Sequence, residues 1–135
     1  WKVIDDIRIN GGDLELAKSQ CLEYMDSYMD LAAVVGLNNG STVGLARALL
    51  ERKRTDLVLV GFDYSEEMRT LIGGGAYFAA SIVQRQYDMG YEGVALAVRL
   101  LAGGAVSCRY VDTGVQQVDH DNVNSPYIQK ILVGE

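Results

Sequence analysis

The chain has 135 residues, 49% of them hydrophobic, and a formal net charge of −6 at pH 7. This length suits one ordinary domain with its own core, and 15 glycines against one proline indicate many tight element ends rather than disorder. The acidic balance argues against a nucleic-acid partner, because a phosphate backbone demands a basic face. The one dense basic cluster, Arg52, Lys53 and Arg54, suits the C-terminus of a helix instead.

Signals for membrane insertion, targeting and disulfides are weak. No apolar run approaches the roughly 20 residues that cross a bilayer, so we expect no membrane span. The chain opens on Trp1 rather than on an initiator methionine, and we therefore expect a processed or truncated piece. Cys21 and Cys108 are far apart, which predicts two buried or half-buried thiols rather than a disulfide framework or a metal site.

The first predicted elements are a strand and a helix. Residues 3–9 alternate apolar and polar side chains, as a half-exposed strand does, and two glycines at 11–12 end that strand. Asp13 can cap the helix, whose apolar side chains recur at a spacing of three and four: Leu14, Ala17, Cys21, Tyr24 or Met25, and Tyr28.

The next elements are a buried strand and a second helix. An apolar run at 31–38 predicts the strand, which ends at Asn38. Ser41 or Thr42 can cap the helix, and the basic cluster at 52–54 closes it.

The middle of the chain repeats this design. The apolar run after the second helix ends in Asp63 and leads to a short helix at 65–72. Glycines at 73–75 follow that helix instead of leading from a strand into one, so they predict a turn and not a phosphate-binding loop. The next apolar strand, 78–84, ends in Gln84.

The last third begins with a strong amphipathic helix that glycines at 103–104 close. We expect a strand at 109–118 and a terminal helix at 125–132, with Pro126 in its first turn. The apolar stripe of the amphipathic helix comprises Tyr87, Tyr91, Val94, Val98 and Leu101.

Strands separated by helices of this length predict an α/β fold, in which helices cover both faces of a parallel sheet. The carboxyl ends of such strands border the crevice where ligands bind. Asn38, Asp63 and Gln84 each end an apolar strand, so we expect them to converge on one small polar molecule. Structural alternatives stay open: Asp63 could cap the third helix together with Glu66. Asn38 could serve a turn, and Gln84 could satisfy nearby backbone.

The sequence offers no catalytic constellation. His120, the sole histidine, lies in a polar loop beside Asp119 and Asp121, where we expect a solvated side chain rather than a metal ligand. The adjacent carboxylates at 5–6 and 66–67 diverge in a strand or helix, so they do not form an acid and base pair. We therefore expect no enzyme activity, no metal and no cofactor.

Three segments carry a family resemblance: GLNNGSTVGLARALLERKR at 36–54, the run from VLVGFDYSEE to VRLLAGG at 58–104, and YVDTGVQQVDHDNV at 110–123. Together they make residues 1–124 resemble the C-terminal half of a type I periplasmic sugar-binding protein of the ribose and galactose type. The resemblance implies an incomplete Rossmann-like lobe of a two-lobed protein. Such a protein captures a sugar or similar small polar ligand, performs no chemistry on it and delivers it to an ABC permease. An extracytoplasmic location, periplasmic or lipid-anchored, is also implied.

The family's ligand-contacting asparagine, aspartate and glutamine fall on Asn38, Asp63 and Gln84, which implies contacts with ligand hydroxyls. An amide both donates and accepts hydrogen bonds, and a carboxylate accepts from two neighbouring hydroxyls. Members of the ribose-binding type often place an aromatic residue before the aspartate that opens the first helix, whereas this chain has Gly12 before Asp13. A smaller or differently shaped ligand, or an aromatic wall from the missing lobe, would explain this departure.

The resemblance divides the chain into three parts. Residues 1–84 correspond to the C-terminal ligand-binding lobe without its first strand and helix, 85–118 to a crossover segment of the other lobe, and 119–135 to the return. Without the missing N-terminal lobe, the crossover helix would expose its apolar stripe. We therefore expect either self-association or retention of that lobe as a separate piece.

Two other functions share this architecture: the effector-binding domain of a sugar-responsive transcription repressor and the ligand-sensing lobe of a signalling receptor. Repressor-type relatives usually carry a proline-rich P-L-T signal where this chain has a glycine-rich segment at 73–77. The tail VQQVDHDNVNS at 115–125 resembles the transporter type. Both features favour the solute-binding protein.

Overall fold

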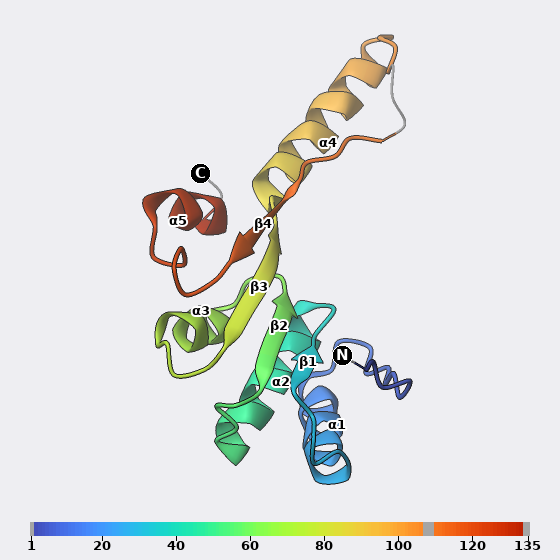
Figure 1. The fold of residues 1–135 in the computed structure, drawn as a ribbon. Coiled ribbons are helices and arrows are strands. Elements are labelled where there is room, and N and C mark those ends of the chain that lie inside the picture. Colours follow the sequence, from blue (N-terminus) through green and yellow to red (C-terminus); the bar gives the residue numbers. More distant parts are fainter. Residues whose placement is uncertain (1, 107–109, 134–135) are drawn as a thin grey trace.

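The computed structural model describes residues 2–106 and 110–133. Within this part the elements are, in order, α1 (Leu14–Ser27), β1 (Ala33–Val35), α2 (Asn39–Arg52), β2 (Val58–Phe62), α3 (Glu66–Gly73), β3 (Ala79–Gln84), α4 (Gln86–Leu101), β4 (Val115–Val118) and α5 (Pro126–Val133). The four strands form one sheet in the order β1-β2-β3-β4 (Figure 1). The predicted α/β class is confirmed, since helices alternate with strands and β1, β2 and β3 are parallel neighbours.

The last strand makes the sheet mixed rather than wholly parallel. The chain leaves β3 at Gln84, runs outward along α4 and returns, so that β4 pairs with β3 in the antiparallel sense (Figure 1). Val115 of β4 stands opposite Gln84. The strand predicted at 109–118 is too long, because residues 110–114 are not in a strand and residue 109 lies outside the described residues.

The hydrophobic core lies on one face of the sheet, where α1, α2, α3 and α5 contribute to a single cluster. Side chains that alternate along the strands point into this core, among them Leu59 and Val83. On the opposite face Val35 and Val58 are exposed, so the second helical layer that we predicted is not formed by the described residues. The largest fully buried side chains are Leu49, Leu57, Leu59, Met68, Ile72 and Ile128.

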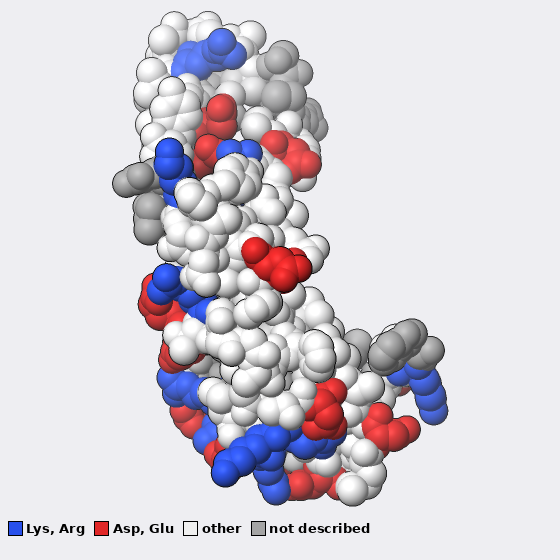
Figure 2. Space-filling view, turned by 60° about the vertical axis from the view of Figure 1, so that its left-hand side comes forward, with Lys and Arg blue, Asp and Glu red and all other residues white. Residues whose placement is uncertain are grey.

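The amphipathic helix predicted after Gln84 is confirmed as α4, but its apolar stripe has no cover. None of its residues is buried. Figure 1 shows α4 projecting away from the sheet, and Figure 2 shows few charged side chains on that part of the surface compared with the end that α1 and α2 form. Among the described residues, no helix is long and apolar enough to span a bilayer. The exposed stripe comprises Tyr87, Tyr91, Val94, Val98 and Leu101.

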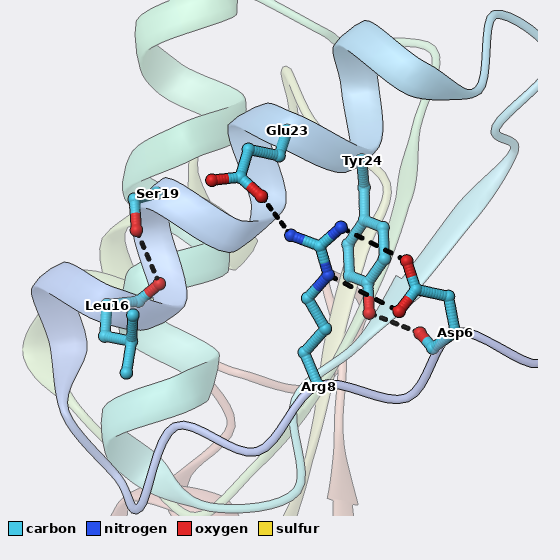
Figure 3. Close-up of polar contacts among 6 residues, drawn as sticks. All are labelled: Asp6, Arg8, Leu16, Ser19, Glu23 and Tyr24. Atoms are coloured by element: carbon cyan, nitrogen blue, oxygen red, sulfur yellow. Dashed lines mark hydrogen bonds and ion pairs between the residues drawn. The ribbon is translucent and has the colours of Figure 1, made fainter.

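The strand predicted at 3–9 is wrong, because the structure assigns no ladder hydrogen bonds to this segment. Its main chain instead lies along α1, where the Tyr24 hydroxyl donates to the carbonyl of Asp6 (Figure 3). The Arg8 guanidinium stacks 4.6 Å from the centre of the Tyr24 ring and pairs with Asp6 and Glu23. Polar residues of the segment are thus the ones bound to α1. The apolar side chains point outward, with exposed fractions of 82% for Val3, 83% for Ile7 and 88% for Ile9.

The helix caps agree with the sequence in one case and differ in another. Asp13 caps α1 as predicted. The cap of α2 is Asn38 rather than Ser41 or Thr42, so that prediction is wrong. Ser41 instead completes a reciprocal capping box, because its hydroxyl accepts from the Asn38 backbone N–H.

The described cysteine behaves as a core residue. Cys21 is a fully buried residue of α1 that belongs to the core cluster, and burial raises the pKa of its thiol to about 12. This confirms the prediction of a buried thiol for Cys21, whereas Cys108 lies outside the described residues.

Candidate functional site

The three polar residues of the predicted site lie at the carboxyl ends of β1, β2 and β3. Since these strands are parallel neighbours, Asn38, Asp63 and Gln84 stand at the same edge of the sheet. The structure brings two of them into contact, because Gln84 Nε2 donates to Asp63 Oδ1 at 2.7 Å. Asn38 makes its own hydrogen bonds within the start of α2.

Asn38 has a structural role as the N-cap of α2. Its Oδ1 accepts from the Ser41 backbone N–H at 2.8 Å and from the Ser41 hydroxyl at 3.0 Å. Residues 39–40 already belong to α2, so the alternative that Asn38 serves a turn is wrong, and this oxygen caps the helix instead. Its Nδ2 makes no hydrogen bond within the described residues and remains a donor for an external group.

We expect Asn38→Ala to lower the free energy of unfolding by about 1 kcal/mol, because α2 loses its N-cap. Asn38→Asp keeps a capping oxygen and should leave the urea midpoint nearly unchanged. An equal loss in both variants would show that the cap is not what Asn38 contributes to stability.

Asp63 does not cap α3. The cap is Ser65, whose hydroxyl accepts from the Met68 backbone N–H at 3.1 Å, so the alternative of a capping box with Glu66 is wrong. Asp63 itself adopts a left-handed backbone with φ 67°, which is uncommon for a residue other than glycine. Backbone of this kind concentrates at functional sites.

The neighbouring Tyr64 packs against the core and bonds to Glu66. Its hydroxyl donates to the Glu66 carboxylate at 2.6 Å. Burial, and to a lesser extent this hydrogen bond, raises the pKa of Tyr64 to about 12, so the hydroxyl stays protonated at neutral pH. Glu66 is therefore engaged with Tyr64 rather than with Asp63.

The start of α1 forms a further wall beside Asn38. Gly12 has φ +84°, and a Cβ there would lie 3.8 Å from the Asn38 amide. A Cβ on Gly40 would lie only 1.9 Å from the Gly12 carbonyl oxygen, so the beginnings of α1 and α2 touch through bare backbone. No pattern in the sequence around Gly12 predicts this contact between the two helix starts.

The side chains at this edge offer hydrogen-bond donors and acceptors. Asp63 takes part in no ion pair among the described residues, which leaves its carboxylate as a hydrogen-bond acceptor. Amide donors and carboxylate acceptors together suit a neutral molecule with several hydroxyls. No cluster of three or more potential metal ligands occurs in the part of the chain that the structure describes.

Two other features lie away from these strand ends. The His120 side chain is exposed as predicted, but its Nδ1 lies 3.1 Å from the Ile72 carbonyl at the end of α3. A shallow groove between α2 and α3 has Leu50, Thr70 and Tyr77 in its lining and includes none of the three predicted site residues.

The chain belongs to the periplasmic binding protein domain family, whose sequence profile matches residues 1–105. The ribose import binding protein RbsB of Escherichia coli (strain K12) is 30% identical over 86 residues, which make up 64% of this chain and 29% of that protein. The family resemblance and the incomplete type I lobe predicted from the sequence are thus confirmed.

Solved structures agree with this assignment. An ABC transporter solute-binding protein from Agrobacterium vitis with bound D-fucose matches 93% of this chain and 43% of its own, with a TM-score of 0.85 and 27% identity. AraP, an arabinose-binding protein from Geobacillus stearothermophilus, matches 84% of this chain and 41% of its own, with a TM-score of 0.72 and 28% identity. The chain spans less than half the length of each of these relatives.

Proposed function

We propose that this chain is the C-terminal half of a sugar-binding protein that serves an ABC importer. The observation that carries the proposal is the alignment of Asn38, Asp63 and Gln84 at one sheet edge, with Gln84 bonded to Asp63 at 2.7 Å. A monosaccharide or similar small polar solute would bind there between two lobes and pass unchanged to the permease. The family's extracytoplasmic setting supports a periplasmic or lipid-anchored location.

Each residue has a separate role in this proposal. The Asp63 carboxylate accepts from ligand hydroxyls, and its desolvated hydrogen bonds supply most of the affinity. Asn38 Nδ2 donates to a ligand oxygen. Gln84 holds Asp63 through Nε2 and offers Oε1 to the ligand.

In this proposal residues 1–84 and 119–135 belong to the ligand-binding lobe, and the crossover segment predicted at 85–118 belongs to the other lobe only as far as β4. The strand β4 itself stays with the ligand-binding lobe, because it pairs with β3 and its Val118 lies in the core. The exposed stripe of α4 supports the division, because an uncovered face of this kind marks an interface. Its proposed occupant is the missing N-terminal lobe.

A sugar panel tests the proposed function. We expect D-ribose, D-fucose or D-arabinose to raise the melting temperature of the intact protein, since a ligand that binds only the folded state stabilises it by mass action. D-Glucuronate serves as the anionic control and should not bind, because Asp63 would repel it. Stabilisation by the anionic sugar alone, or by no neutral sugar, would contradict the proposal.

Association of the isolated chain tests the division into lobes. Size-exclusion chromatography with light scattering should give residues 1–135, expressed alone, a molar mass above the 14.7 kDa of one chain. The reason is that the exposed apolar stripe of α4 favours association. A well-folded monomer without a bound fragment would show that α4 does not belong to another lobe.

A further inference from the structure

The backbone just before Asp63 is hydrogen-bonded by the buried hydroxyl of Thr42, at a point where β1 has already ended. On the β1 side of β2, Gly36 N–H donates to the Val60 carbonyl at 2.9 Å. The next group along, Phe62 N–H, donates to Thr42 Oγ1 at 2.9 Å instead of to β1. The same hydroxyl donates to the Phe62 carbonyl at 3.2 Å.

The peptide groups of Asp63 itself are held from the other side. Its N–H donates to the Ile82 carbonyl of β3 at 2.9 Å. Its carbonyl accepts from the Ser81 hydroxyl at 2.6 Å. Two side-chain hydroxyls from different elements therefore fix the backbone on both sides of the one residue of this turn that has a left-handed φ.

The surrounding backbone leaves room for these hydroxyls. Thr42 and Ser81 are both buried, at 0% and 2% exposure. A Cβ on Gly36 would lie 2.6 Å from Thr42 Oγ1, and a Cβ on Gly61 would lie 2.3 Å from Thr42 Cγ2. Glycine at the ends of β1 and β2 thus lets Thr42 reach the peptide group that precedes Asp63.

We propose that Thr42 and Ser81 are positioning residues that aim the Asp63 carboxylate at the ligand. The inference rests on the proposed function of Asp63 in ligand binding. A left-handed aspartate relaxes to an extended backbone unless its surroundings prevent it, and such a change would swing the carboxylate away from Gln84. The two hydroxyls oppose this change, whereas Gln84 acts only on the tip of the side chain.

A crystal structure of the Thr42→Val, Ser81→Ala variant of the intact protein tests the geometry without any ligand. We expect Asp63 to leave the left-handed region and to lose its hydrogen bond to Gln84. Thr42→Ser keeps the hydroxyl and should keep both features. If the double variant does not fold, Ser81→Ala alone answers the question, and an unchanged Asp63 overturns the inference.

Calorimetric titration with the tightest-binding neutral sugar of the panel tests the consequence. Thr42→Val and Ser81→Ala should each raise the Kd by about tenfold, as when one hydrogen bond to a charged group is misaligned. Thr42→Ser, which retains the hydroxyl, should keep the wild-type affinity. In an Asp63→Asn background the same substitutions should change the Kd by less than about twofold, because their effect passes through the carboxylate.

The outcomes separate this inference from the proposed function. An equal loss of affinity in both backgrounds would mean that the hydroxyls do not act through the Asp63 carboxylate and would overturn the positioning role. Wild-type affinity in Asp63→Asn would contradict the proposed binding role of Asp63, and the crystal structure would then decide whether the hydroxyls position it.

Discussion

Replacing Asp63 by alanine in the intact protein is expected to weaken sugar binding by about one to two orders of magnitude. Loss of charge-assisted hydrogen bonds to a desolvated hydroxyl costs roughly 1.5–3 kcal/mol. Stability should change far less, because Asp63 caps no helix and forms no ion pair among the described residues. Isothermal titration calorimetry gives the affinity, and urea denaturation gives the stability.

The matched control is Asp121→Ala, which removes an exposed carboxylate from the loop before α5. We expect it to leave the affinity unchanged. Equal affinities for Asp63→Ala and wild type would remove Asp63 from the site, and an equal loss in both variants would point to a general electrostatic effect.

Gly40→Ala is expected to be severely destabilising, by about 3 kcal/mol. The new Cβ would lie 1.9 Å from the Gly12 carbonyl oxygen, and backbone cannot swing away as a side chain can. The beginnings of α1 and α2 must then separate beside Asn38. We therefore expect a lower urea midpoint and weaker sugar binding together.

Gly73→Ala is the control for this substitution, because it also places alanine in a helix. A Cβ there would meet its nearest neighbour, Val123, at 3.7 Å, an ordinary contact. Gly73→Ala should stay close to wild type. If Gly40→Ala were equally stable, the close approach of the two helix starts would be refuted.

Local periodicity was enough to predict most of the fold. Runs such as 57–63 and 78–84 bury alternate side chains, and α1 and α4 follow their helical patterns. The strand at 3–9 failed because alternation shows that a segment is extended but not that it has a partner. The direction of β4 was missed because it depends on where the chain goes after Gln84, which no local pattern records.

The candidate site was predictable only in part. The pattern of a polar residue at the end of an apolar strand was sufficient to predict that Asn38, Asp63 and Gln84 lie at one edge of the sheet. Their role in ligand binding stays a prediction. Thr42 and Ser81 were missed, since a buried hydroxyl has the same sequence signature as any serine or threonine. A polar side chain inside the apolar run at 78–84 was the one clue to Ser81. The contacts of Thr42 require the three-dimensional meeting of α2 with the end of β2.

A crystal structure of the intact protein with a bound monosaccharide tests the central proposal most directly. We expect ligand hydroxyls within hydrogen-bond distance of the Asp63 carboxylate, Asn38 Nδ2 and Gln84 Oε1, at the carboxyl ends of β1, β2 and β3. A sugar bound elsewhere, such as in the groove between α2 and α3, with Asp63 left in contact with water, would contradict it.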